Sequence, residues 1–292
     1  IFIDHRIDRQ VGTRRLRVVK YRGSAHGTAE YPFLIGEQGV ELIPITSFRL
    51  DYDVSKERIS TGVADLDEML GGEGYFVGSS ILLTGTAGTG KSSLAGAFAE
   101  KVCESGGRAL VFAYEESESQ IVRNMESIGV HVARWLEDGS LTIVAERPAL
   151  SGLEEKLHMM TTELERHQPT AVVIDPISGM SLIGRPLEVR HMLTRFADSL
   201  KQRNITTLLT SLKGEEAIDL EKEVGISSVV DTWIDLKAQE FSGRLRNELR
   251  VVKSRGMQHS RHVAQIVISH TGLSIVEIPS QKHESEATEV QG

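Results

Sequence analysis

The stretch SILLTGTAGTGKSS, residues 80–93, constrains the fold of this chain more than any other. It contains G-x-x-x-x-G-K-S, with Gly85, Gly90, Lys91 and Ser92 at the fixed positions. An apolar run precedes the motif and a helical pattern of small and apolar residues follows it, which is the context that a phosphate-binding loop requires. Glycines let backbone N–H groups surround phosphates at a helix N-terminus, whose dipole favours anions. The sequence therefore predicts a nucleotide site.

Residue types within this loop suggest its cofactors, which are ATP and Mg²⁺. Lys91 is expected to reach the β- and γ-phosphates, and Ser92 is expected to supply an oxygen to Mg²⁺. The residues predicted to contact ATP through the loop are Thr86, Ala87, Gly88, Thr89, Gly90, Lys91, Ser92 and Ser93.

Further apolar strand patterns follow the loop, and amphipathic helical patterns separate them. Alternation of this kind predicts an α/β fold, with a mostly parallel sheet that helices flank on both faces. The predicted strands are 108–114, 141–146, 170–176 and 205–211, and the clearest helices are 150–167 and 186–203.

Acidic and hydroxyl side chains stand at the ends of these strands. Ligands of parallel sheets bind at the carboxyl ends of the strands, so these side chains should converge on the phosphate loop. Asp175 is expected to hold Mg²⁺, or alternatively to cap a helix. Glu115 or Glu116 is expected to orient or deprotonate the attacking oxygen, with Glu115 also a magnesium ligand, unless both are simply solvated. Thr210 or Ser211 is a candidate sensor of the γ-phosphate, or else a loop cap.

The chain repeats one phrase near its two ends. LRVVKYRG begins at Leu16 and LRVVKSRG begins at Leu249, 233 positions later. Extending this alignment through Ile45 and Ile278 without a gap gives 11 identities in 30. Two unrelated β-hairpins are the alternative, but a match of this length favours a tandem duplication.

A duplication predicts three parts. Residues 1–50 would be the C-terminal tail of a preceding domain with its linker, and residues 51–279 would form a second, complete domain. The polar segment 280–292 is predicted to be disordered or to bind a partner.

The amino-acid composition indicates the compartment of the protein and the classes of partner it is expected to lack. One cysteine, Cys103, excludes an internal disulfide and favours a reducing compartment, so we expect a cytoplasmic location. No apolar run approaches a membrane span, so no membrane association is expected. The net charge of −8 argues against a nucleic-acid partner, because duplex binding needs a positive surface.

Several motifs resemble a known family. The segment 58–93 is similar to the opening of RecA/RadA/DnaB-type ATPases. The stretches FAYEESESQIVRNMESIG, VVIDPIS, GISSVVDTW and VVKSRGMQHS resemble the KaiC family of circadian-clock ATPases and autokinases, over nearly the whole chain. The resemblance implies a RecA-like P-loop ATPase with a C-terminal antiparallel β extension, and two such domains in tandem.

The family also implies a homohexameric ring with ATP at the subunit interfaces. In that ring the K-x-R-G motif would place Lys253 and Arg255 on the neighbour's phosphates, where arginine stabilises charge on a transferring phosphoryl group. Both side chains lie on one face of a strand, because side chains alternate with period 2. Asn247 stands where the family often has arginine, which leaves one ribose or base contact open. Further nucleotide contacts implied by the family are Ser254, Gly256, Gln258 and Ser260.

Autophosphorylation is the activity that the family adds. Its acceptor pair matches Ser227 and Ser228, and Lys222 replaces a further family threonine. Glu115 would act as the base, while Lys91 and Mg²⁺ neutralise charge. A KaiB-like or other signalling partner is a candidate that the family suggests.

Two other classes compete with this interpretation. A nucleic-acid-dependent ATPase of the RecA/RadA/DnaB type would share the core. However, the loop 213–225 carries five acidic residues against two lysines, and aromatics are only 5% of the chain, so phosphate and stacking contacts are disfavoured. A passive nucleotide-gated scaffold is the third class, because the glutamate pair could be structural.

Overall fold

The computed structural model describes most of the chain. The described residues are 1–8, 11–23, 25–27, 30–36, 39–42, 54–147, 152–184, 186–213 and 229–278. The predicted acceptors Ser227 and Ser228, the tail 280–292 and nearly all of the acidic loop 213–225 lie outside these residues.

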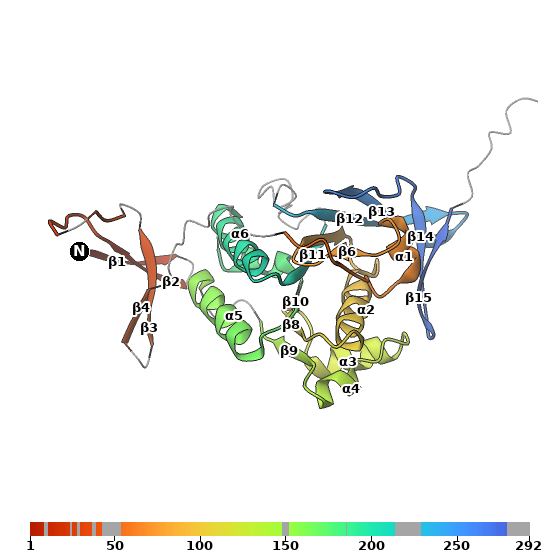
Figure 1. The fold of residues 1–292 in the computed structure, drawn as a ribbon, viewed down its shortest axis with the longest axis horizontal. Coiled ribbons are helices and arrows are strands. Elements are labelled where there is room, and N and C mark those ends of the chain that lie inside the picture. The colour runs from red at the N-terminus through yellow and green to blue at the C-terminus, as the bar shows by residue number, and fades with distance from the viewer. Residues whose placement is uncertain are drawn as a thin grey trace, which may run out of the picture.

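A nine-stranded sheet of order β15-β14-β13-β12-β7-β11-β10-β8-β9 organises the chain (Figure 1). The strands from β12 to β9 in this order run parallel, and β13, β14 and β15 extend one edge antiparallel. This confirms the predicted α/β sheet with its antiparallel extension. The bounds are β7 Ser80–Gly85, β8 Ala109–Ala113, β9 Leu141–Ala145, β10 Ala171–Asp175, β11 Thr206–Leu212, β12 Thr232–Phe241, β13 Arg244–Ser254, β14 Ala264–Ser269 and β15 Gly272–Glu277.

Helices cover both faces of the sheet. Adjacent residues of a strand point to opposite faces, so Leu83 packs in the core with α2 while Leu82 packs in the core with α5 and α6. No helix within the described ranges is long and apolar enough to cross a membrane. The helices are α1 Ala64–Met69, α2 Lys91–Glu104, α3 Glu118–Glu126, α4 Ala133–Glu137, α5 Leu153–His167 and α6 Pro186–Gln202, with a 3₁₀ helix at Ile177–Leu182 and a small sheet of β5 Arg58–Ile59 and β6 Tyr75–Phe76.

The N-terminal residues form a separate four-stranded antiparallel sheet, which lies beyond α5 and α6 in Figure 1. Its strands are β1 Phe2–Asp8, β2 Val11–Arg17, β3 Tyr31–Gly36 and β4 Gly39–Leu42. Adding 233 to its pairs reproduces the pairing of β12 to β15. The matching pairs are Phe2↔Arg17 with Asp235↔Arg250, Leu16↔Tyr31 with Leu249↔Ala264, and Phe33↔Leu42 with Ile266↔Ile275. The sequence repeat is therefore also a repeat of strand register.

Candidate nucleotide-binding site

The phosphate loop connects the centre of the sheet to α2. Gly85 ends β7, and a Cβ there would lie 2.5 Å from the carbonyl oxygen of Leu236 on the adjacent strand. Gly90 caps α2 with φ of 98°, in the left-handed region that glycine adopts most readily. Thr86, Ala87 and Gly88 are exposed at the tip of the loop. The tip of the loop is thus exposed at the N-terminus of α2, and its predicted contacts with phosphate stay a prediction.

Lys91 lies at the base of this loop. Its Nζ donates to the carbonyl oxygens of Gly85 at 2.8 Å and Thr86 at 2.7 Å, and the residue is only 6% exposed. Burial lowers the pKa of Lys91, while the negative charges of Asp175 and Glu115 act in the opposite direction. The ammonium group is therefore held at the base of the loop by two backbone carbonyls.

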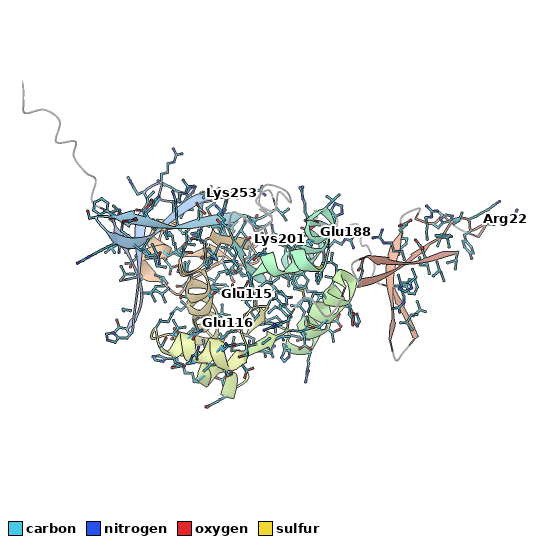
Figure 2. All side chains as sticks on the ribbon, turned by 180° about the vertical axis from the view of Figure 1, so that it is seen from behind. Arg22, Glu115, Glu116, Glu188, Lys201 and Lys253 are labelled. Atoms are coloured by element: carbon cyan, nitrogen blue, oxygen red, sulfur yellow. The ribbon has the colours of Figure 1, made fainter. Side chains whose placement is uncertain are left out.

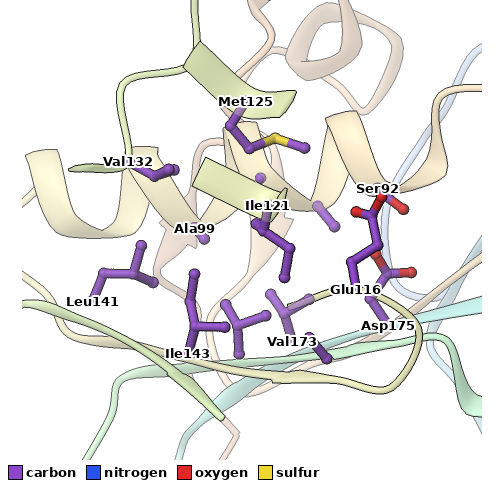
Figure 3. A pocket seen from close by; sticks show the side chains of 14 residues that line it. Ser92, Ala99, Glu116, Ile121, Met125, Val132, Leu141, Ile143, Val173 and Asp175 are labelled. Carbon is purple, nitrogen blue, oxygen red and sulfur yellow. The ribbon is translucent and has the colours of Figure 1, made fainter. Parts of the chain in front are cut away.

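Three oxygen-bearing side chains meet beside the loop. Ser92, Glu116 and Asp175 line one cavity, and Figure 3 shows their side chains close together at its polar end. The rest of the cavity wall is mainly apolar and comes from α2, α3 and the sheet. Carboxylate and hydroxyl oxygens suit Mg²⁺, which binds few protein ligands and keeps waters and substrate phosphates as the others. No cluster of three or more His, Cys, Asp or Glu suited to a metal occurs in the described part of the chain, but a phosphate-bound Mg²⁺ does not require one.

The two glutamates at the end of β8 differ in their surroundings. Burial raises the pKa of Glu115, and the charge of Asp175 adds to this, while Lys91 opposes it. Glu115 therefore interacts electrostatically with the lysine of the loop. Glu116 faces the cavity and accepts a hydrogen bond of 3.0 Å from Nδ2 of Asn124. Both carboxylates lie at the phosphate end of the sheet.

The hydroxyl residues at the end of β11 are buried. Thr210 donates a hydrogen bond to Oδ1 of Asp175, so its influence on a γ-phosphate would pass through that carboxylate. Ser211 is 3% exposed. The hydroxyl of Thr89 also turns inward, since it donates to the Thr86 carbonyl at 2.8 Å. A contact from Thr89 to ATP would therefore come from its backbone N–H.

The K-x-R-G motif lies at the opposite end of the sheet. Lys253 pairs with Trp233, which pairs with Leu82, and the Arg255 N–H donates to the Asp231 carbonyl beside Ser80. The start of β7 is about 17 Å from its end at the loop, at ~3.3 Å per residue. Figure 2 shows Lys253 separated from Glu115 and Glu116. Arg255, level with the start of β7, thus lies about 17 Å along the strand from the loop of its own chain, and Lys253, level with Leu82, lies about 10 Å from it.

The remaining family-implied contacts surround this motif. Ser254 is buried, and its hydroxyl lies 2.8 Å from that of Thr232, so its side chain faces away from Lys253 and Arg255. Gly256 has φ of 75° in the turn that follows. Gln258 is exposed, and the Ser260 N–H donates to the Met69 carbonyl at 2.8 Å. A nucleotide contact from Ser254 would have to use its backbone.

Asn247 occupies a different position. Its Nδ2 donates to the Gly88 carbonyl at 3.2 Å, so it contacts the phosphate loop of its own chain.

Comparison with known proteins identifies the family. A family model described as "ATPase: KaiC" matches residues 59–280. The chain belongs to the KaiC ATPase family. The circadian clock protein KaiC2 of Synechocystis sp. is 43% identical over 279 residues, which is 95% of this chain and 49% of that protein. The circadian clock oscillator protein KaiC of Parathermosynechococcus lividus is 35% identical over 266 residues, or 90% and 48%. The KaiC of Synechococcus elongatus is also 35% identical, over 90% of this chain and 50% of its own length. This chain spans about half the length of these curated relatives.

Structure adds residues to this KaiC-family site that the sequence patterns did not. Asn124 holds Glu116, and Asp235 accepts hydrogen bonds from Thr84, Lys213 and Arg250. A signal existed for Asp235, since a carboxylate inside an apolar strand is buried only when partners satisfy it. The sequence gives no such signal for Asn124, because polar residues are common on the exposed face of an amphipathic helix.

Proposed function

We propose that this KaiC-family chain hydrolyses ATP and phosphorylates itself on Ser227 or Ser228 in a homohexameric ring with ATP between subunits. Lys253 and Arg255 would act on the nucleotide held by the neighbour's loop. One observation supports the proposal: the residues expected to act in phosphoryl transfer lie in two groups, toward opposite ends of the sheet. Lys91, Glu115 and Asp175 are at one end, and the K-x-R-G motif is at the other. A head-to-tail ring joins the two groups.

The chemistry requires one P–O bond to form and one to break. A serine hydroxyl oxygen attacks the γ-phosphorus, its proton moves to Glu115, and the bond to the β-phosphate oxygen breaks to release ADP. Water in place of serine gives hydrolysis. Ser92 and Asp175 would hold Mg²⁺, which neutralises phosphate charge when bound. Lys91 stabilises the phosphates from the same chain.

A preceding domain of the same kind belongs to the proposal. Ile268 packs against the loop, since a Cβ on Gly90 would lie 3.0 Å from its Cδ1. Its counterpart in the first repeat, Ile35, is 60% exposed. A P-loop body before residue 1 would cover Ile35, and the twofold length of the curated relatives supports such a body. The names of those relatives support a circadian or related signalling role. A KaiB-like partner and a cytoplasmic location are further parts of the proposal, which rest on the family resemblance and on the single cysteine.

The test is phosphopeptide mass spectrometry after incubation with Mg·ATP. The proposal expects phosphate on Ser227 or Ser228, and loss of that signal when Lys91 is replaced by Ala. Phosphate elsewhere, or nowhere, contradicts the autokinase. Tight, salt-dependent binding to single- or double-stranded DNA with stimulated ATP turnover would instead favour the RecA/RadA/DnaB-type function.

A further inference from the structure

Asp235 is a buried carboxylate that joins three strands. It is 8% exposed and lies in the middle of the apolar stretch TWIDL in β12. Oδ1 accepts hydrogen bonds from Thr84 Oγ1 at 2.8 Å and from Lys213 Nζ at 2.6 Å, and Oδ2 accepts one from Arg250 Nη2 at 3.1 Å. We call these four residues the Asp235 cluster.

Each donor of the Asp235 cluster belongs to a different part of the proposed machinery. Thr84 directly precedes Gly85 of the phosphate loop. Lys213 opens the segment that leads to the proposed acceptors, and its N–H also donates to the Gly85 carbonyl at 3.0 Å. Arg250 lies three residues before Lys253, on the strand that carries the K-x-R-G motif. One carboxylate therefore joins the residue before the loop, the residue after β11 and the strand of the K-x-R-G motif.

Charge makes this arrangement stiff. Burial alone would raise the pKa of Asp235, but the hydrogen bonds from Lys213, Thr84 and Arg250 outweigh it and hold the pKa below its ordinary value. Trp233 adds a hydrogen bond of 2.9 Å from Nε1 to the Thr84 hydroxyl. Charge-assisted hydrogen bonds are strong and directional. The bond between the buried Thr84 and Asp235 is shielded from water, whereas Lys213 and Arg250 reach Asp235 from partly and largely exposed positions, where water weakens the ion pair.

The first repeat shows that the β fold does not require this carboxylate. Phe2 stands at the position equivalent to Asp235, and Arg17 at the position equivalent to Arg250. Arg17 lies over the Phe2 ring, 5.8 Å from its centre. The arginine and the strand register are thus kept in both repeats, while the acid is present in the second repeat and replaced by Phe2 in the first.

We propose that Asp235 is a positioning residue that keeps Lys213, at the end of β11, and the K-x-R-G strand aligned with the phosphate loop. It touches no phosphate itself. Its effect on phosphoryl transfer rests on the proposed function, but its effect on the two attached segments does not. Replacing the charge should uncouple those segments while the loop still binds nucleotide.

The first measurement is hydrogen exchange of the full chain, with and without Mg²⁺ and a non-hydrolysable ATP analogue. In the wild type the analogue should slow exchange at residues 84–90, 211–213 and 250–255. In Asp235→Asn it should still slow residues 84–90, while the slowing falls about 10-fold at 211–213, the worth of one charged hydrogen bond. At 250–255 it should fall by only about 2- to 5-fold, because the Arg250 side chain is largely exposed. The dissociation constant of the analogue should stay within about threefold, because the loop is intact.

Asp231→Asn is the matched control. Asp231 precedes the same strand and likewise accepts a hydrogen bond from a β7 hydroxyl, that of Ser80 at 2.9 Å, and pairs with Lys201 at 2.7 Å. It lies at the end of β7 remote from the phosphate loop. Asp231→Asn should therefore lower the free energy of unfolding by a similar amount, while the analogue still slows hydrogen exchange at residues 211–213.

Single-donor variants cover the case in which Asp235→Asn does not fold. Lys213→Gln should reduce the slowing of hydrogen exchange only at residues 211–213, and Arg250→Gln should reduce it only at residues 250–255. Equal slowing in every variant and the wild type would overturn the proposal. A wild type that never phosphorylates itself would refute the autokinase, yet the exchange pattern would still decide the role of Asp235. If the autokinase is real, its rate should fall at least about tenfold in Asp235→Asn, since alignment of the reacting atoms is lost.

Discussion

Asn124 donates a hydrogen bond of 3.0 Å from Nδ2 to Oε1 of Glu116, at the polar end of the cavity shared with Ser92 and Asp175. The amide is itself fixed, because Arg123 donates to Asn124 Oδ1 through Nε at 3.2 Å and Nη2 at 3.0 Å. Helix α3, which begins with a Ser117–Gln120 capping box, therefore sets the direction of a carboxylate beside the phosphate loop.

Asn124→Ala should lower kcat for ATP hydrolysis about tenfold with KM nearly unchanged, because one hydrogen bond to a charged group is lost. Asn124→Asp should lower kcat further, since it places a second carboxylate opposite Glu116. Asn124→Gln keeps the donor and should recover part of the rate. Steady-state kinetics check this, with Glu118→Gln, an exposed residue in the first turn of the same helix, as control. Equal rates for the Ala and Asp variants would argue against a role in directing Glu116.

Glu115→Gln should lower the rate of ATP hydrolysis between about 10²- and 10⁴-fold, the usual contribution of a general base. Binding of Mg·ATP should persist, because Lys91 and the loop are untouched. Single-turnover hydrolysis and equilibrium binding together check the prediction. Glu118→Gln, in the first turn of α3, is the matched control. Unchanged turnover in Glu115→Gln would favour the passive scaffold.

Lys253→Ala or Arg255→Ala should abolish most phosphoryl transfer. For Arg255→Ala the rate should fall about 10³-fold or more, the usual effect of removing an arginine that stabilises the transferring group. Lys20→Ala and Arg22→Ala, in the first repeat, should leave it nearly unchanged (Figure 2 labels Arg22). An equal loss from both pairs would overturn the assignment.

A mixing experiment tests whether the arm acts between subunits. Lys91→Ala and Arg255→Ala are each expected to be inactive alone. Co-assembled rings should regain part of the activity, because some interfaces join an intact loop to an intact arm. Mixtures that stay inactive, under conditions where mixed rings form, would contradict action in trans.

Cys103 should resist modification in the folded chain. It is 3% exposed, and burial raises its pKa to about 11, so at pH 8 it has about 100-fold less thiolate than a free cysteine. Thiol titration should be slow in buffer and fast in denaturant. Because the folded state holds the thiol proton more tightly, the free energy of unfolding should fall as pH rises from about 9 towards 11. Cys103→Ser should remove that component of the pH dependence.

Sequence patterns predicted the elements that depend on neighbouring residues along the chain. The G-x-x-x-x-G-K-S spacing predicts a strand, a loop and a helix, and the structure has them as β7, the loop 86–90 and α2. Apolar runs at α/β spacing predicted the parallel strands, since buried strands read as continuous apolar segments. The repeat predicted matching strands at both ends of the chain. The domain boundaries and the acceptors Ser227 and Ser228 stay predictions.

Tertiary structure alone decided which of these elements touch. Strand order places β12 between β7 and β13, and only that order lets Asp235 reach both Thr84 and Arg250. The antiparallel direction of β13 carries the K-x-R-G motif toward the start of β7, away from Lys91. Periodicity reports which face of a strand is buried, but it carries no information on which strand lies alongside. Hydrogen bonds between distant segments, such as that from Asn124 to Glu116, are therefore fixed by the packed fold rather than by any local pattern.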